Sequence, residues 1–371
     1  MHNETERRAA LDAFVATPSG RGRPNRYWKL DLDALDVSAF TPNAASTTVT
    51  ISAPNGVTAC SLEEALDSFA DIVARAQEHR GNGKFAHLTR AFAQTGAFVH
   101  VPAGRIIDEP IHIHTRANDA DGAFALTIIV IEAGASATVI EEFEAVPGAT
   151  LVYDSHAEVG ESARLTASAI AHVPADARVY VTRSARPQRD AHVAFSHADL
   201  GAALAVAEID ITLDGPGANG ELDALFFPSA TQHVDLLTRV DHRVGHTTSR
   251  TAIKSAANGS GQGRYLGIIR IIADAQGSDA SLRDDALLLS RGAHIDSVPA
   301  LEIAANDVKA FHGATIGAID EEQLFYMASR GVPRDQAEKM IALGFFEPVI
   351  EKFPTDSLRK QLREALEAKL A

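Results

Sequence analysis

The sequence predicts a mainly β protein with helical regions at its two ends. From residue 98 onward, short apolar or alternating segments follow one another, separated by turns rich in Gly, Asp, Ser and Ala. Many short strands without helices between them are typical of an all-β architecture, which can be a sandwich, a barrel or a solenoid. One turn pattern recurs at residues 132–140 and 157–165, and this repetition of small residues favours a solenoid of directly stacked coils. The expected strands are residues 98–104, 111–114, 126–131, 178–182, 193–196, 205–213, 224–227, 234–240, 268–272, 287–289 and 301–303.

Residues 1–96 are predicted to form an N-terminal helical region. The expected elements are a helix at 4–15, a strand at 47–51, one amphipathic helix at 61–79 and a helix at 84–94. Ser61 and Glu64 have the spacing of a capping box, and apolar residues at helical spacing follow them. The Pro- and Gly-rich residues 18–24 read as a linker, and Trp28 is expected to be buried where this linker meets the main body.

The pattern changes back to helix after a predicted β core of residues 97–318. The expected elements of the C-terminal region, residues 319–371, are a helix from Asp320 to Gly331, a second helix from 335 that ends near Gly344, and a third helix from Thr355. Asp320 and Gln323 have capping-box spacing, and Gly331 is a typical helix C-cap. These helices could close the end of a solenoid, dock a partner protein, or do both.

Composition excludes several classes of function. The net charge of -15 argues against a nucleic-acid-binding protein, because a phosphate backbone needs a basic surface. The chain has no apolar run long enough to span a membrane, and its charged N-terminus does not resemble a signal peptide, so we expect a cytoplasmic protein. A single cysteine, Cys60, excludes an internal disulfide framework and a multi-cysteine zinc site.

Histidines are the candidate metal ligands. His312 stands alone between Phe and Gly, a context in which a structural role is commoner than a ligand role. His112 and His114 would share one face of a strand and could chelate a metal, although an exposed solenoid face explains them better. His242 and His246 also have ligand-like spacing, which leaves a cupin-like metal enzyme as a possible class.

Acidic residues offer another reading, in which the chain is a β-helix enzyme acting on carbohydrate. Such a lyase or hydrolase would need clustered carboxylates on one face, and Asp284-Asp285 is the only adjacent Asp pair. Aromatic residues make up only 6% of the chain, which is few for a cleft that binds sugars. Glu141, Glu142 and Glu144 are predicted to form a solvated acidic edge.

The chain resembles the SufB/SufD family of iron–sulfur cluster assembly scaffolds, most strongly from residue 242 to residue 346. The motifs that carry the resemblance, in chain order, are His242-Arg-Val-Gly-His246-Thr-Thr-Ser249, Tyr265-Leu-Gly267-Ile-Ile269, Leu287-Leu-Leu-Ser290, Pro299-Ala-Leu-Glu-Ile303, Asp307-Val-Lys309, His312-Gly-Ala-Thr315-x-Gly317 and Leu324-Phe-Tyr326-x-x-Ser-Arg-Gly331. Each motif alone is weak, whereas the ordered set is specific.

Within that family the chain is most similar to SufD. Gly313 follows His312 where SufB typically has a Glu, and SufB carries more cysteines than this chain, whose only one is the distant Cys60. Ala310 stands where the family often has a Cys two positions before the His, so a second ligand is missing there.

The resemblance implies a fold, partners and site residues. It implies a right-handed parallel β-helix that pairs with a SufB-like paralogue, docks a SufC-like ABC ATPase, and receives sulfur indirectly from a cysteine desulfurase system. It implies a non-catalytic scaffold on which an iron–sulfur cluster is built transiently at the interface, with His312 as the ligand from this chain. The docking region for the ATPase is expected at Leu324, Phe325, Tyr326, Arg330, Gly331, Phe345 and Phe346.

Overall fold

The computed structural model describes residues 4–17, 27, 30, 35, 37–78, 83–120 and 122–370. The predicted linker at 18–24 and the tryptophan at position 28 lie outside these ranges. Within them, no helix is both long and apolar enough to pass through a lipid bilayer.

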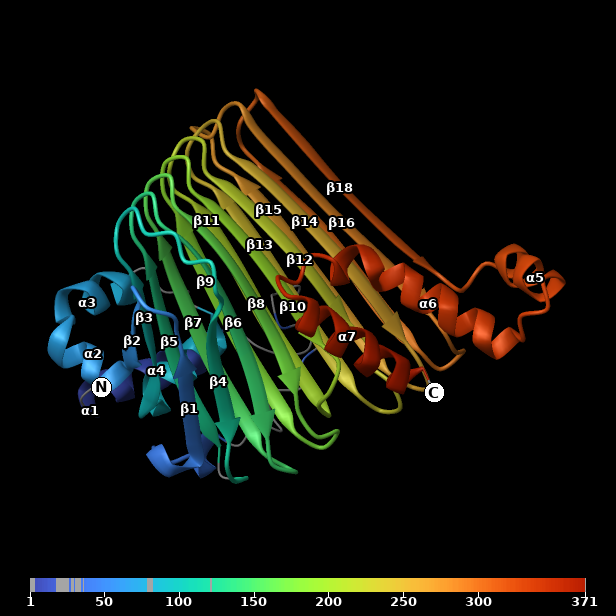
Figure 1. Cartoon of the computed structure of the whole chain (residues 1–371), viewed down its shortest axis with the longest axis horizontal. Coiled ribbons are helices and arrows are strands. Elements are labelled where there is room, and N and C mark those ends of the chain that lie inside the picture. Colours follow the sequence, from blue (N-terminus) through green and yellow to red (C-terminus); the bar gives the residue numbers. More distant parts are fainter. Residues whose placement is uncertain are drawn as a thin grey trace.

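Two nine-stranded sheets run along the molecule, enclose one core between them and form a β-solenoid (Figure 1). Sheet A has the order β1-β4-β6-β8-β10-β12-β14-β16-β18, and sheet B has the order β17-β15-β13-β11-β9-β7-β5-β3-β2. Pairing is parallel from β3 to β18, whereas β1 and β2 pair antiparallel with β4 and β3. This arrangement confirms the predicted mainly β solenoid flanked by helices.

Most strands are longer than the apolar segments that predicted them, and β3 begins three residues earlier than predicted. Their bounds are β1 Thr47–Ser52, β2 Thr58–Ser61, β3 Thr95–Val101, β4 Ile111–Ala117, β5 Ala123–Ile131, β6 Ser136–Ala145, β7 Thr150–Val159, β8 Arg164–His172, β9 Arg178–Pro187, β10 His192–Asp199, β11 Leu204–Leu213, β12 Asn219–Phe226, β13 His233–His242, β14 Thr248–Ala257, β15 Gln262–Ile271, β16 Ser278–Leu288, β17 His294–Ile303 and β18 Val308–Gly317. Polar residues extend each strand because only alternate side chains face the interior.

Small and β-branched side chains fill the interior between the two sheets. Because the strands stack in register, each inward residue lies over an inward residue of the coil below, for example Val179 over Leu151. The turns between strands are tight: Gly134 connects β5 to β6 with a φ of +66° and donates to the carbonyl of Glu161 in the next coil over 2.8 Å. The repeated Gly pattern of the sequence therefore marks the corners of the coils.

Four N-terminal helices cover the outer face of sheet B: α1 Glu4–Ala16, α2 Leu62–Ser68, α3 Ala70–Glu78 and α4 Lys84–Phe92, with two short 3-10 turns at Val37–Ala39 and Ala44–Ser46. The prediction of one helix over 61–79 is wrong, because the chain breaks between α2 and α3. Phe69 leaves helical geometry, with φ -134° and ψ 32°, and its ring stacks on Phe98 of the sheet with centroids 5.4 Å apart. Tertiary packing of one aromatic ring thus overrides a continuous helical pattern.

Three C-terminal helices follow the solenoid: α5 Glu321–Ser329, α6 Arg334–Ile350 and α7 Asp356–Lys369. Helices α6 and α7 lie across the outer face of sheet A, and α5 projects beyond it (Figure 1). The expectation that the second helix ends near Gly344 is wrong, since α6 continues through Pro348. Pro348 lies within the last turn, where the hydrogen bond that it cannot donate would go to the exposed Gly344, so solvent can satisfy that carbonyl.

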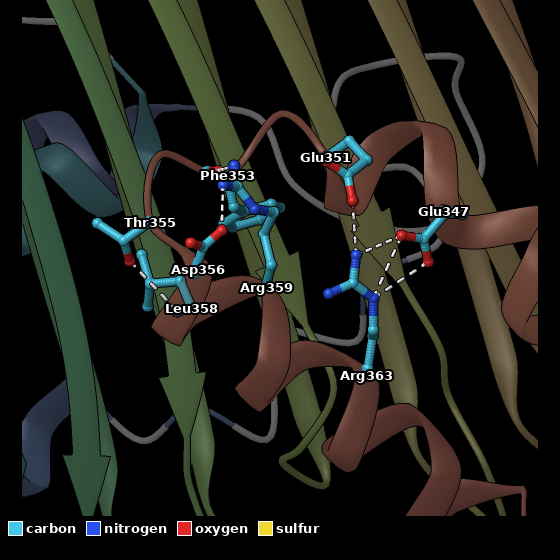
Figure 2. Close-up of polar contacts among 8 residues, drawn as sticks. All are labelled: Glu347, Glu351, Phe353, Thr355, Asp356, Leu358, Arg359 and Arg363. Carbon is cyan, nitrogen blue, oxygen red and sulfur yellow. Dashed lines mark hydrogen bonds and ion pairs between the residues drawn. The ribbon is translucent and has the colours of Figure 1, made fainter.

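Apolar packing and a polar network hold α6 and α7 together. Phe346 is buried against Phe227, which directly follows β12, with ring centroids 6.1 Å apart. Arg363 of α7 forms ion pairs with Glu347 of α6 and with Glu351, the residue that follows this helix, as Figure 2 shows. Both helices therefore lie along the side of the solenoid, which disfavours the alternative that they close its end.

Candidate interface and metal site at the open end

His312 lies on β18, the last strand of sheet A. It stands in register over Leu282 of β16, which belongs to the interior core, so His312 occupies an inward-facing position. It is nonetheless exposed, because no further coil of the described residues lies above β18. Within the described ranges, its ring makes no hydrogen bond. An exposed imidazole with free nitrogens is a competent metal ligand.

The strand around His312 offers room for another backbone. Gly317 has open space where a side chain would begin. Ala310 and Ala314 carry only a methyl group each, so the inward face of β18 has few atoms beside His312. Gly313 is different, because a Cβ there would lie 3.1 Å from the ring of Phe311, so its lack of a side chain accommodates this chain's own phenylalanine.

The last coil, formed by β17 and β18, is uncovered along its outer edge. Both strands end the order of their sheets, so each has a hydrogen-bonding edge with no strand beyond it in the described part of the chain. Large apolar side chains are exposed on the same coil: Phe311 is 58% exposed and Ile316 is 44% exposed, and Val298 and Ile303 join them. An uncapped coil that exposes apolar residues is typical of a surface that another protein covers.

A complete metal site does not form within this part of the molecule. The described residues contain no group of three or more His, Cys, Asp or Glu side chains that could hold a metal ion. His312 could therefore contribute one ligand to a site whose other ligands come from elsewhere.

Three of the other candidate histidines, His112, His114 and His242, have partners. His242 is buried, with its Nδ1 2.7 Å from the hydroxyl of Thr247 and its Nε2 2.9 Å from the hydroxyl of Ser249. Burial lowers the pKa of His242 to about 4, so the ring is neutral and structural. Because both ring nitrogens of His242 are within hydrogen-bond distance of hydroxyl groups, this histidine is not available as a metal ligand, which argues against a cupin-like metal enzyme.

On the outer face of sheet A, two other histidines lie beside carboxylates. His112 is 3.7 Å from Glu142, and His114 is 3.3 Å from Glu144. All four side chains are at least partly exposed, as expected for a solvated face of the solenoid.

The acidic run at residues 141–144 is split between two faces, and the prediction that Glu141 is solvated is wrong. Glu141 is fully buried in the interior, where Arg183 lies 2.9 Å from its Oε2 and the hydroxyl of Tyr153 donates to its Oε1 over 2.7 Å. Burial, and then the neighbouring carboxylate, raise the pKa of Tyr153. Strand alternation could have separated Glu141 from its two neighbours, but only once the inward face was known.

The Asp pair at 284 and 285 is also split. Asp284 faces the interior, whereas Asp285 faces outward and forms an ion pair with Lys254 over 2.8 Å. Two carboxylates on opposite faces of a strand cannot act together on one glycosidic bond, which removes the main support for a carbohydrate-active enzyme.

The predicted docking region divides into exposed and buried parts. On α5, Phe325 is 76% exposed and Tyr326 is 60% exposed, and the guanidinium of Arg330 lies 5.4 Å from the ring centre of Tyr326. Gly331 ends the helix in a left-handed conformation with a φ of +84°. Leu324, Phe345 and Phe346 lie in this chain's own packing, Phe345 only partly, so they support the helices more than they face outward.

Comparison with known proteins identifies the family of this chain. The sequence profile described as "SUF system FeS cluster assembly, SufBD core domain" matches residues 112–345, and the SufBD protein N-terminal region matches residues 7–113. An iron–sulfur cluster assembly SufBD family protein of Mycobacterium leprae is 30% identical over 285 residues, which cover 74% of this chain and 31% of the relative. Proteins of the same description from Staphylococcus epidermidis and Staphylococcus aureus strain MRSA252 are each 28% identical over 292 residues, covering 78% of this chain and 62% of the relative.

The match thus spans about one third to three fifths of the length of these relatives. The match covers a larger share of this chain, because the core profile runs from β4 through α5 into α6. The matched residues include the last coil with His312 and the exposed helix α5. Because the two profiles together cover residues 7–345, this chain belongs to the SufBD family of the SUF iron–sulfur cluster assembly system.

Proposed function

We propose that this chain is a non-catalytic, SufD-like scaffold subunit of the SUF system. It pairs with a SufB-like paralogue through β17 and β18, and the paired subunits hold a nascent iron–sulfur cluster to which His312 contributes one ligand. The cluster is cargo that is built and passed on. The observation that carries the proposal is the uncovered last coil, where strand edges and an imidazole without partners among the described residues coincide with exposed apolar side chains.

A SufC-like ABC ATPase docks on the C-terminal helices in this proposal. The sequence contains no phosphate-binding loop of its own, so ATP hydrolysis requires a partner. Helix α5 supports this role because it projects from the body and exposes two aromatic rings, which are favoured anchors in protein interfaces. Sulfur reaches the complex from a cysteine desulfurase system, without direct contact with this chain.

The test is anaerobic cluster reconstitution on the complex co-expressed with its SufB-like and SufC-like partners. We expect His312→Ala to leave assembly of the complex unchanged and to reduce the amount of cluster formed. His294→Ala is the matched control, because His294 is an exposed histidine on the same coil that already lies 3.2 Å from Asp296. Equal cluster yields from wild type and His312→Ala would refute the ligand role. Failure of the wild-type proteins to assemble would refute the scaffold proposal itself.

A further inference from the structure

Asp284 is a buried carboxyl group one coil below the open end. It lies on β16, in register with Ala314 of β18 above it and Ile253 of β14 below it. Its side chain is completely buried, and neither carboxylate oxygen receives a well-formed hydrogen bond from the described residues. A buried carboxylate without donors is costly, so this position is unusual for a residue that serves only to fill the core.

The groups that face Asp284 offer it little compensation for a negative charge. On β17, Ser297 occupies an inward position beside it and lowers its pKa, although the two groups do not reach ordinary hydrogen-bond geometry. The remaining titratable groups nearby are Asp285 on its own strand, Lys254 on β14, Tyr265 on β15 and, on β18, His312, which stands over Leu282 and not over Asp284. Burial therefore dominates and raises the pKa of Asp284 from 3.8 to about 7.

The strand that covers Asp284 is the last strand of its sheet. Among the described strands of sheet A, β18 alone lies above it, and β18 pairs with a neighbour on one side only. Edge elements with few buried contacts open at a lower free energy than the centre of a fold. Opening of this strand would hydrate the carboxylate and relieve its cost.

We propose that Asp284 is a positioning residue that acts as a proton-operated latch on the last coil. With the carboxyl protonated, β18 packs down over it and His312 is held in place. With the carboxylate formed, the coil loosens and His312 becomes free to move toward a partner. The loosening of β18 is a property of this chain and does not depend on any partner. The idea that loosening presents His312 to a partner rests on the proposed function.

The direction of the pH effect follows from linkage. The closed coil holds Asp284 at a pKa above its ordinary value, so closure is fully favoured below about pH 4 and loses stability as the pH rises to about 7. If opening restores the ordinary pKa, the opening equilibrium increases about eightfold between about pH 6 and about pH 7.5.

Hydrogen–deuterium exchange of the full chain tests the latch. Protection of the amides of β18, corrected for the intrinsic pH dependence of exchange, should fall several-fold over that range in wild type and stay constant in Asp284→Asn. Asp279→Asn is the matched control, because it makes the same change at an exposed position of the same strand and should keep the wild-type slope. An unchanged slope in Asp284→Asn, or no slope in wild type, overturns the proposal.

A second variant separates this proposal from the ligand role. His312→Ala should keep the pH dependence of β18 protection, because the latch does not use the imidazole. Loss of the slope in His312→Ala would show that His312 is the titrating group and would also overturn the latch. If Asp284→Asn fails to fold, Ser297→Ala provides the test: removal of the hydroxyl that lowers the pKa of Asp284 should move the fall in protection to higher pH, and an unmoved midpoint would count against the latch.

Discussion

At the scale of single residues, the face of a strand decides what an acidic side chain does. Glu141 and Glu142 are neighbours in the sequence, yet one is paired with Arg183 in the interior and the other lies beside His112 on the surface. The sequence predicted both as solvated, because alternation gives two faces without saying which one is inside. Acidic residues are usually exposed, so the burial of Glu141 could be recognised only from the register of the coils.

The buried pair of Arg183 and Glu141 should dominate local stability. Arg183→Met removes the cation and leaves a carboxylate without its charge partner in the interior. We expect a loss of about 3–5 kcal/mol in the free energy of unfolding, as is typical when one partner of a buried pair is removed. Chemical denaturation followed by circular dichroism measures this change.

The control for this substitution is Arg189→Met, which removes an exposed arginine lying 3.7 Å from Glu161. Exposed pairs contribute little, so this variant should unfold close to wild type. The double variant Arg183→Met with Glu141→Gln should recover part of the loss. Equal stabilities of Arg183→Met and Arg189→Met would contradict the structural importance of the buried pair.

At the scale of elements, helix starts were predictable and helix interruptions were not. The side chains of Ser61, Asp320 and Thr355 each accept a hydrogen bond from the first turn that follows, which is a local interaction written in a few residues. The break at Phe69 and the continuation of α6 past Gly344 depend on distant partners, namely the sheet beneath each helix. Local signals therefore predicted element type well, and packing decided element length.

Helix α5 gives a prediction at the same scale. Replacing Phe325 and Tyr326 together by Ala should weaken binding of the SufC-like ATPase by at least about tenfold, because exposed aromatic rings are frequent interface anchors. The stability of this chain should not change, since both side chains are already exposed. Isothermal titration calorimetry with the purified ATPase measures the affinity.

A control for docking is Val15→Ala, which truncates an exposed apolar residue on α1 at the opposite end of the chain. It should bind the ATPase as wild type does. Unchanged affinity of the α5 variant would move the docking site away from this helix.

At the scale of the whole molecule, the repeated turns made the solenoid predictable from the sequence, but they did not show which end of it would be uncovered. Recurrent small-residue turns indicate stacked coils, because each coil repeats the same local geometry. Whether a coil is covered depends on where the flanking helices come to lie, and no local pattern states this. The sequence predicted His312 through its family resemblance, whereas the structure adds the uncovered coil on which it lies.

The open end can be blocked without disturbing the rest of the solenoid. Ile316→Lys places a charge on the uncovered coil, and charged residues on edge strands oppose strand-to-strand pairing. We expect co-expression with the SufB-like paralogue to yield separate subunits, where wild type yields a heterodimer by size-exclusion chromatography with light scattering. Ile106→Lys is the matched control, because Ile106 is 72% exposed near the other end of the solenoid, in the turn before β4. If Ile316→Lys still forms the heterodimer, the paralogue binds elsewhere, and the free edges of β17 and β18 need another explanation. If Ile106→Lys also prevents pairing, added charge acts through general solubility and not through the last coil.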